Sequence, residues 1–399
     1  MKIAHPVQPT LWLAILVLGS IMPLMGVAPN RILTPKGEYL LSLLDRPLVL
    51  LPLFSIVLML PLFIGQNALR ARQVLLVLLC WVAFTSLALF AGRFASESLV
   101  DNKYARVSFG GGFWAVALLL WLLAMDALQR LFSQSWQRAV LALLFLCPLI
   151  GLVSADRFHD LSLLIEYRSN QEAFDNALGE HLTIVGLTLA LTLVMGLALG
   201  IFSYRHPRFG RPCLNLLSIL QTIPSIALFG LLLAPLSALA KQLPWLSALG
   251  ISGIGMAPAV IALLLYSLLP MVRATVTGLA QVPAPLLEAA RGMGMTERQS
   301  LWQVQLRLAL PVILSGLRVT TVQAIGLTMV AALIGAGGFG SLMFRGLSAS
   351  ALDLILLGVI PVVALAALAD TLFKVLVQFT QPDTRSTSTD NLPAGGETA

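Results

Sequence analysis

Long apolar runs separated by short polar segments make up most of the sequence. Ten of these runs approach the roughly 20 residues that an α-helix needs to cross bilayer hydrocarbon. The runs are continuous and lack the alternation of membrane β-strands, so helices are favoured. The predicted spans are 11–28, 48–65, 74–92, 112–131, 138–155, 181–203, 214–240, 255–277, 311–335 and 353–379. The pattern predicts an all-α, polytopic membrane protein with about ten transmembrane helices.

Composition supports the same class of protein. Hydrophobic residues make up 58% of the 399 residues and charged residues only 11%, whereas soluble domains carry about 25% charged residues. The net charge of +7 is explained by basic cytoplasmic loops and needs no nucleic-acid partner. Cys80, Cys147 and Cys213 lie in or beside apolar runs without CxxC spacing, and the four histidines are scattered, so neither a disulfide framework nor a metal site is predicted.

Basic residues in short loops predict the orientation. Arg70 and Arg72, and later Arg205, Arg208 and Arg211, lie in loops without acids, which is typical of the cytoplasmic side. This orientation places both termini in the cytoplasm. The first apolar run lacks a persuasive small-residue cleavage site, so we expect a retained span.

One polar segment divides the chain. Residues 156–180 are the most polar internal stretch and predict an extracytoplasmic linker. Residues 1–155 then form an N-terminal membrane region of about five helices, and residues 181–379 form a second membrane region. The Ser-, Thr-, Asp- and Gly-rich segment 381–399 predicts a disordered cytoplasmic tail.

A charged island interrupts the second membrane region between residues 280 and 310. Pro283 and Pro285 favour a helix start, because proline is tolerated only before or in the first turn. Gly292 and Gly294 are expected to end that helix. Thr296 can cap a second helix. Four residues of this second helix share one face at helical spacing: Leu301, Trp302, Gln305 and Leu308.

This island resembles the cytoplasmic coupling loop, or EAA motif, of importer-type ABC permeases. Glu-Ala-Ala begins at Glu288, and an apolar pair follows Gly294 at the family's spacing. In that family two short helices dock into a groove on an ATPase subunit. The chain departs from the family pattern at Arg307, where proline is usual, while Pro311 is in place. The resemblance implies the following ATPase-coupling residues: Glu288, Ala289, Ala290, Arg291, Gly292, Gly294, Leu301, Val304 and Leu306.

Four other segments resemble the osmoprotectant branch of these permeases, which imports glycine betaine, choline, carnitine or proline betaine. They are residues 221–232, 264–279, 310–326 and 332–347. The resemblance covers about residues 181–379, whose last five helices would form an importer-type permease core. It is closest to Gram-negative glycine betaine uptake permeases that carry an extra N-terminal membrane region.

Several polar residues inside the core are candidates for the pathway or a gate. Gln221, Thr222, Pro224 and Ser225 interrupt an apolar run, which predicts either a polar spot in the pathway or a structural kink. Arg318 lies inside a span and should face a cavity, form a pair or, as we favour, snorkel to the cytoplasmic edge.

A polar stripe and a glycine run complete the candidates. Gln323 continues a stripe of threonines that could line a pore or join helices by hydrogen bonds. Gly337 and Gly338 lie in a run from Gly335 to Gly340 that lacks the Gly-Lys-Ser/Thr of a nucleotide loop. We expect a tight turn at the outer end of a span and a candidate outer gate.

The resemblance implies a permease subunit that is not an enzyme and has no catalytic residues, cofactor or metal of its own. ATP would be bound by a separate cytoplasmic ABC ATPase. The other implied partners are a periplasmic substrate-binding protein, a second identical or related permease subunit and the lipid bilayer. The expected location is the bacterial inner membrane.

Three alternatives remain open. The first is an ABC permease for an amino acid such as methionine. The second is an ion-coupled secondary transporter, which is disfavoured because the span carboxylates Asp126 and Asp370 lie in the predicted cytoplasmic halves rather than at mid-membrane. The third is a membrane enzyme, which no HExxH, nucleophile motif or His/Asp/Glu cluster supports.

Overall fold

The computed structural model describes residues 7–30, 33–63, 70–102, 104–243, 245, 251 and 253–380. Within them, eight helices are long and apolar enough to cross a membrane, and two shorter apolar helical segments lie near the N-terminus. The prediction of an all-α, polytopic membrane protein is confirmed. The predicted tail at 381–399 lies outside the described residues.

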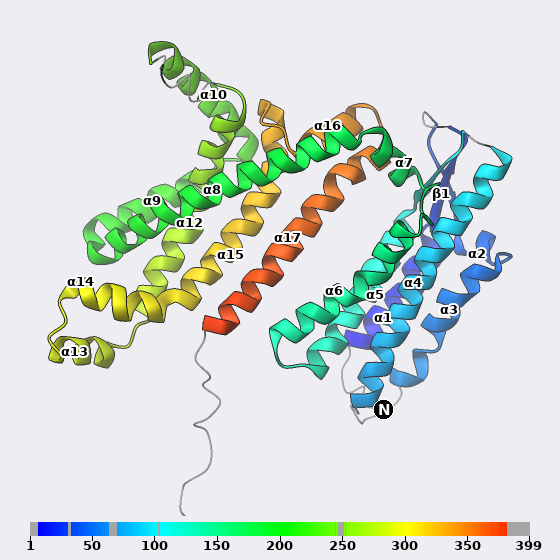
Figure 1. Ribbon diagram of the computed structural model, residues 1–399, viewed down its shortest axis with the longest axis horizontal. Helices are drawn as coiled ribbons and strands as arrows, with labels where there is room; N and C mark the ends of the chain where they lie inside the picture. The colour runs from blue at the N-terminus through cyan, green and yellow to red at the C-terminus, as the bar shows by residue number, and fades with distance from the viewer. Residues whose placement is uncertain are drawn as a thin grey trace, which may run out of the picture. The chain divides into compact units, whose positions relative to one another are not determined.

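The chain forms two compact units (Figure 1). The first unit comprises Met1–Leu182 and Ala331–Ala364, and the second comprises Thr183–Val330 and Leu365–Ala399. The first contains α1 (Val7–Ile21), β1 (Met25–Ala28), β2 (Lys36–Glu38), α2 (Leu40–Leu43), η1 (Pro47–Val49), α3 (Leu50–Val57), η2 (Leu60–Phe63), α4 (Arg70–Asp101), β3 (Arg106–Phe109), α5 (Gly111–Leu131), α6 (Ser135–Ser154), α7 (Ser162–Ser169), η4 (Ala332–Ile334) and α16 (Phe339–Ser348).

The second unit is built from the remaining helices. They are α9 (Pro207–Thr222), α10 (Ser225–Gln242), α12 (Met256–Ala280), α13 (Ala284–Gly292), α14 (Glu297–Gln299), a π-helical segment (Ser300–Gln305) and α15 (Leu306–Ala331). Two helices contribute to both units, namely α8 (Gln171–Arg205) and α17 (Leu352–Thr380). α7 and the start of α8 lie in the predicted linker, residues 156–180. The predicted domain boundaries on either side of this linker stay a prediction.

Small residues let the helices of the first unit pack closely. α4 packs against α5, α5 against α1, and α3 against α4 (Figure 1). Lipid tails are as apolar as leucine, so membrane helices associate through close packing rather than through the hydrophobic effect. Five alanines of α4 and α5 are fully buried: Ala83, Ala91, Ala95, Ala124 and Ala127.

A three-stranded antiparallel sheet of order β2-β1-β3 lies at one end of these helices. Met25 of β1 pairs with Glu38 of β2 and with Phe109 of β3. The predicted span 11–28 is therefore wrong at its end, because α1 stops at Ile21 and the chain turns at Pro23 into β1. Proline cannot donate the backbone hydrogen bond that a continuing helix needs.

Asp126 belongs to a polar cluster that joins α1, α4 and α5. Gln8 Nε2 donates to Gln73 Oε1 at 2.8 Å and to Asp126 Oδ2 at 2.9 Å. Arg130 Nε donates to the same carboxylate at 2.7 Å. Pairing with a cation and an amide is one of the ways in which a membrane helix bundle accommodates a carboxylate.

A buried polar contact joins the sheet to the start of α17 within the first unit. Ser108 Oγ of β3 donates to Asp353 Oδ2 at 2.6 Å. Both residues are buried, and Asp353 lies in the first turn of α17, where the helix dipole favours a negative charge. Arg345 at the end of α16 donates to Asn170 Oδ1 at 2.8 Å. Ser108 and Asn170 therefore bind residues on either side of the short connection between α16 and α17, namely Asp353 and Arg345.

We expect Ser108→Ala to lower the melting temperature of the detergent-solubilised protein. The substitution removes the donor to a buried carboxylate, which costs about 1–3 kcal/mol. Ser98→Ala is the matched control, because Ser98 Oγ donates only to Phe94 O of its own helix. Equal melting temperatures for the two variants would show that the Ser108–Asp353 contact does not stabilise the protein.

Candidate functional site

The candidate coupling loop begins with a helix whose limits follow from local sequence. Pro283 is the non-helical residue before α13, and Pro285 lies in its first turn. α13 ends at Gly292, and Gly294 adopts a positive φ of 77°. Gly294 N donates to Arg291 O at 2.9 Å and Met295 N to Ala290 O at 3.1 Å, which is the Schellman arrangement. The predicted helix end is confirmed.

Thr296 begins the second helix of the loop, as predicted. Its side chain accepts from Gln299 N at 3.3 Å, and its own N–H donates to Gln299 Oε1 at 2.8 Å. This reciprocal pair is a capping box, which satisfies two helix-terminal donors at once. The two short helices are therefore joined by a turn of defined geometry.

The predicted apolar face of the second helix is wrong. Residues Ser300–Gln305 form a π-helical segment, whose wider turns move side chains off the α-helical spacing. Leu301 is buried, whereas Trp302 is 59% and Leu308 is 43% exposed. Leu301 packs in a buried cluster with Met271 and Leu279 of α12 and with Ala309 and Ile313 of α15 instead of facing a partner.

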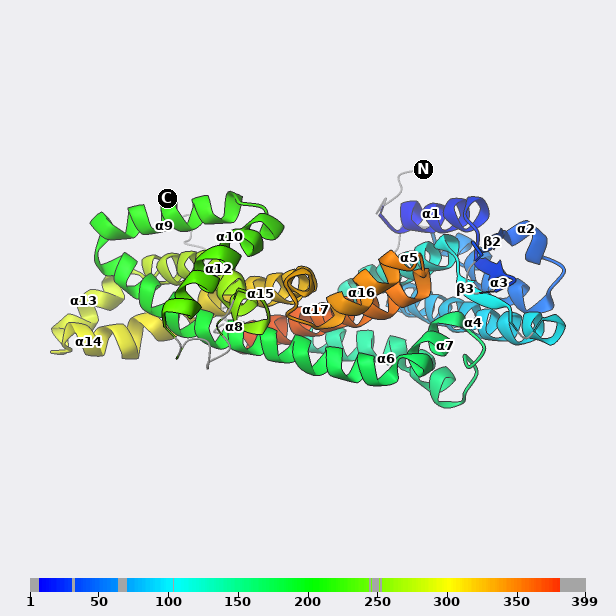
Figure 2. The ribbon, with the colours of Figure 1, turned by 90° about the horizontal axis from the view of Figure 1, so that it is seen from above.

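Three large apolar side chains between the start of α13 and the end of the π-helical segment are exposed, and we call them the coupling surface: Leu286, Met293 and Trp302. Their exposed fractions are 45%, 71% and 59%. Glu288, Arg291 and Arg298 of the same segment are also exposed. Exposed apolar residues among charged ones are typical of a protein-docking site, and tryptophan is often its strongest contributor. In the second unit, α13 and α14 project at one end (Figure 2).

The predicted coupling residues divide into exposed and internal ones. Those exposed are Glu288, Ala289, Arg291, Gly292 and Gly294. Val304 and Leu306 are half-buried, and Ala290 and Leu301 are buried. Sequence reasoning did not assign Leu286 and Met293 to the site, although both are apolar residues within the charged island.

We expect Gly294→Val to reduce transport without removing the protein from the membrane. A β-branched residue at positive φ costs on the order of 1–2 kcal/mol, while no atom lies within 4 Å of the added Cβ. The strain therefore reshapes only the turn. Gly294→Asn is the matched control, because asparagine tolerates this conformation. The measurement is the uptake rate at equal membrane abundance, and equal rates for both variants would contradict the argument.

The segment Gln221–Ser225 forms a break between two helices of the second unit. α9 ends at Thr222, and Pro224 precedes α10 in a non-helical conformation. Gln221 Nε2 donates to Tyr266 O at 2.7 Å, and the Tyr266 hydroxyl donates to Ile223 O. The predicted span 214–240 is therefore two helices clamped by α12. These contacts favour the structural kink, and a role in the pathway stays a prediction.

Arg318 forms an ion pair, which corrects the expectation that it snorkels. Its Nε donates to Asp370 Oδ1 at 2.5 Å, and Lys374 Nζ lies 2.7 Å from Asp370 Oδ2. The pair joins α15 to the part of α17 that belongs to the second unit. An ion pair with partly buried partners is one of the accepted ways to place a charge in a membrane helix.

The polar stripe of α15 bonds within its own helix. The hydroxyls of Thr320, Thr321 and Thr328 donate to carbonyls four residues earlier, at 2.9, 2.8 and 2.7 Å. Gln323 lies half-buried on the same helix. Each of these hydroxyl protons is therefore used within α15, and a role of the stripe or of Gln323 in the pathway stays a prediction.

The glycine run forms the tight turn that the sequence predicts. Gly335, Gly337 and Gly338 all have positive φ, between 75° and 82°. Gly338 N donates to Glu180 Oε2 at 2.7 Å. A Cβ on Gly337 would collide with the Glu180 carboxylate. The start of α8 therefore holds this turn through glycine backbone, while its role as a gate stays a prediction.

Close helix contacts in the second unit also depend on glycine. A Cβ added to Gly196 or Gly200 of α8 would lie 2.6 Å from Met271 Cγ or 2.5 Å from Thr275 Cβ of α12. Small residues four positions apart let membrane helices approach closely in this way.

Comparisons with known proteins agree with these features. Residues 192–386 match the family of binding-protein-dependent transport system inner membrane components, and residues 5–164 match the N-terminal domain of the ABC transporter permease YehY. This chain belongs to the family of binding-protein-dependent transport system inner membrane components.

Two relatives illustrate the branch of the family. The chain is 43% identical over 193 residues to the osmoprotectant import permease protein OsmW of Salmonella typhimurium. The aligned residues make up 48% of this chain and 85% of OsmW. The chain is 35% identical over 192 residues to the glycine betaine/carnitine/choline transport system permease protein OpuCB of Bacillus subtilis, covering 48% and 81%. A solved structure of the inward-facing MetNI methionine ABC transporter has a TM-score of 0.47 and 21% identity, covering 54% of this chain and 99% of that one.

Proposed function

We propose that this chain is the permease subunit of an ABC importer that carries a quaternary-amine osmoprotectant, such as glycine betaine, across the bacterial inner membrane. The coupling surface carries this proposal, because exposed Leu286, Met293 and Trp302 need a protein partner. The names of OsmW and OpuCB support the cargo.

The proposed complex contains several further subunits. A cytoplasmic ABC ATPase binds ATP and docks on the coupling surface, and this chain hydrolyses nothing and holds no cofactor. A periplasmic binding protein delivers the solute, and a second permease subunit, identical or related, completes the pathway. Both termini of this chain lie in the cytoplasm.

The helices behind the coupling surface suggest how movement is transmitted. The π-helical segment continues directly into α15, whose 26 residues span about 39 Å at 1.5 Å per residue. Gly278 of α12 lies so close to α15 that an added Cβ would be 3.2 Å from Ala309 Cβ. A displacement of the loop therefore moves α12 and α15 together as a rigid body.

The test is uptake of radiolabelled glycine betaine by cells that lack other betaine transporters. The cells express this chain with its neighbouring ATPase, binding protein and any second permease. We expect ATP-dependent uptake that unlabelled choline or carnitine reduces by competition. Methionine uptake without betaine uptake would show that the proposed cargo is wrong and that the chain serves an amino-acid importer. Uptake that an ionophore stops but loss of ATP does not would show that the chain is an ion-coupled transporter and not part of an ABC importer.

A further inference from the structure

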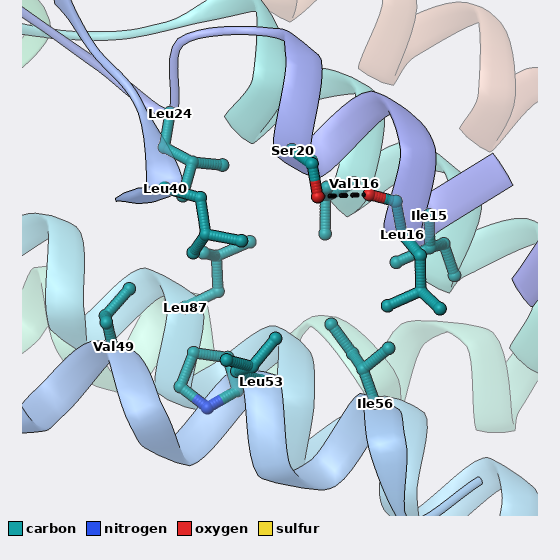
Figure 3. A pocket seen from close by; sticks show the side chains of 12 residues that line it. Ile15, Leu16, Ser20, Leu24, Leu40, Val49, Leu53, Ile56, Leu87 and Val116 are labelled. Atoms are coloured by element: carbon teal, nitrogen blue, oxygen red, sulfur yellow. Dashed lines mark hydrogen bonds between the residues drawn. The ribbon is translucent and has the colours of Figure 1, made fainter. Parts of the chain in front are cut away.

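We propose that an apolar cleft in the first unit binds one acyl chain of a bilayer phospholipid. The cleft lies among α1, α3, α4 and α5. Leu16 of α1 faces Leu53 and Ile56 of α3 across it (Figure 3). Leu87 of α4 and Val116 of α5 form part of its floor.

The chemistry of the walls excludes a polar ligand. Among the described residues that line the cleft, Ser20 alone has a polar side chain, and its hydroxyl donates to Leu16 O at 2.7 Å (Figure 3). A buried water molecule needs two to four polar partners, which these walls do not offer. An empty apolar cleft is also unfavourable, because the atoms that line it lose dispersion contacts on one side.

The surroundings of the cleft identify its occupant. The outer faces of α1 and α3 beside the cleft carry exposed apolar residues, among them Leu13, Val17, Leu51 and Phe54. In a membrane protein such a surface faces lipid, so the cleft is continuous with the lipid-facing surface. At the end away from the sheet, the Trp12 indole N–H donates to Ile56 O at 2.7 Å and joins the two helices.

The depth of the cleft suits a lipid tail. Val116 is the sixth residue of the 21-residue α5, which places it about 8 Å from the start of a helix about 31 Å long. An acyl chain that enters the cleft moves from hydrocarbon to hydrocarbon, so it gains packing contacts without a hydrophobic transfer energy. We therefore expect acyl chains in the cleft to exchange with those of the surrounding bilayer, and the high concentration of lipid to keep the cleft occupied.

Photolabelling of the full-length chain in vesicles tests the site. The vesicles consist of phosphatidylethanolamine, with a small fraction carrying a diazirine midway along one acyl chain. After irradiation and digestion, we expect label on Leu16 and Leu53. Leu53→Trp should remove most of the label from Leu16, because the indole fills the cleft. Leu51→Trp adds the same group to the exposed side of α3 and should leave the label unchanged.

A second pair of variants fills the cleft from its opposite wall. Leu16→Phe should remove the label from Leu53, and Val17→Phe, on the exposed face of α1, should not. Each variant must elute as a monodisperse species with unchanged melting temperature. The proposal is wrong if correctly folded wild-type protein carries label on exposed Phe54 but not on Leu16 or Leu53, or if neither filling variant lowers the cleft label.

Discussion

Trp302→Glu is expected to abolish ATP-driven uptake while the protein remains in the membrane at normal abundance. Trp302 is 59% exposed in the π-helical segment of the charged loop. A tryptophan of this kind contributes about 2–4 kcal/mol to a protein interface. A carboxylate in its place removes that contribution and adds a charge that must lose its water on docking. Uptake should fall to below about a tenth of wild type, and the ATPase should no longer copurify with this chain.

Gln303→Glu is the control for the added charge. Gln303 is the next residue and is exposed, so the variant adds the same carboxylate without removing an apolar contact. We expect its uptake to stay within about two-fold of wild type. Normal uptake by Trp302→Glu would show that the ATPase docks elsewhere. Equal loss in both variants would show that charge, and not the indole, decides docking.

The limits of the coupling helices could be predicted because they depend on neighbouring residues. Pro283 starts α13, Gly294 ends it and Thr296 caps the next helix, each through contacts within a few positions. The π-helical segment after Gln299 could not be predicted. This segment packs against α13 and, through buried Leu301, against α12 and α15, which no local pattern shows. The hydrophobic pattern also assumes α-helical spacing throughout.

Long-range contacts account for the other differences. β1 is apolar and continues the run of α1, so a hydrophobicity pattern merges the two, and its partner β3 lies about 80 positions later. Arg318 could be recognised as a charge that needs a partner. Nothing local identifies Asp370, 52 positions away, as that partner. The same holds for Tyr266, which clamps the break at Pro224.

Asp370→Leu is expected to destabilise the protein more than any other single change in the α15–α17 contact. It leaves Arg318 without its carboxylate inside the membrane region. Removing one partner of a buried pair costs about 3–5 kcal/mol, and the cost here is lower because about a third of the Arg318 side chain is exposed. Lys374→Leu is the control, since Lys374 is 50% exposed and its pair contributes less than about 1 kcal/mol. The measurement is the melting temperature in detergent.

The double variant Arg318→Leu/Asp370→Leu separates a structural role from a role in the pathway. Replacing both partners of a buried ion pair by apolar residues is often neutral or stabilising, so the melting temperature should return to the wild-type value. We expect uptake to return with it, because the geometry shows a tie between α15 and α17. Restored stability without restored uptake would instead show that the Arg318 guanidinium acts on the solute, which is the pathway role for which Arg318 is a candidate.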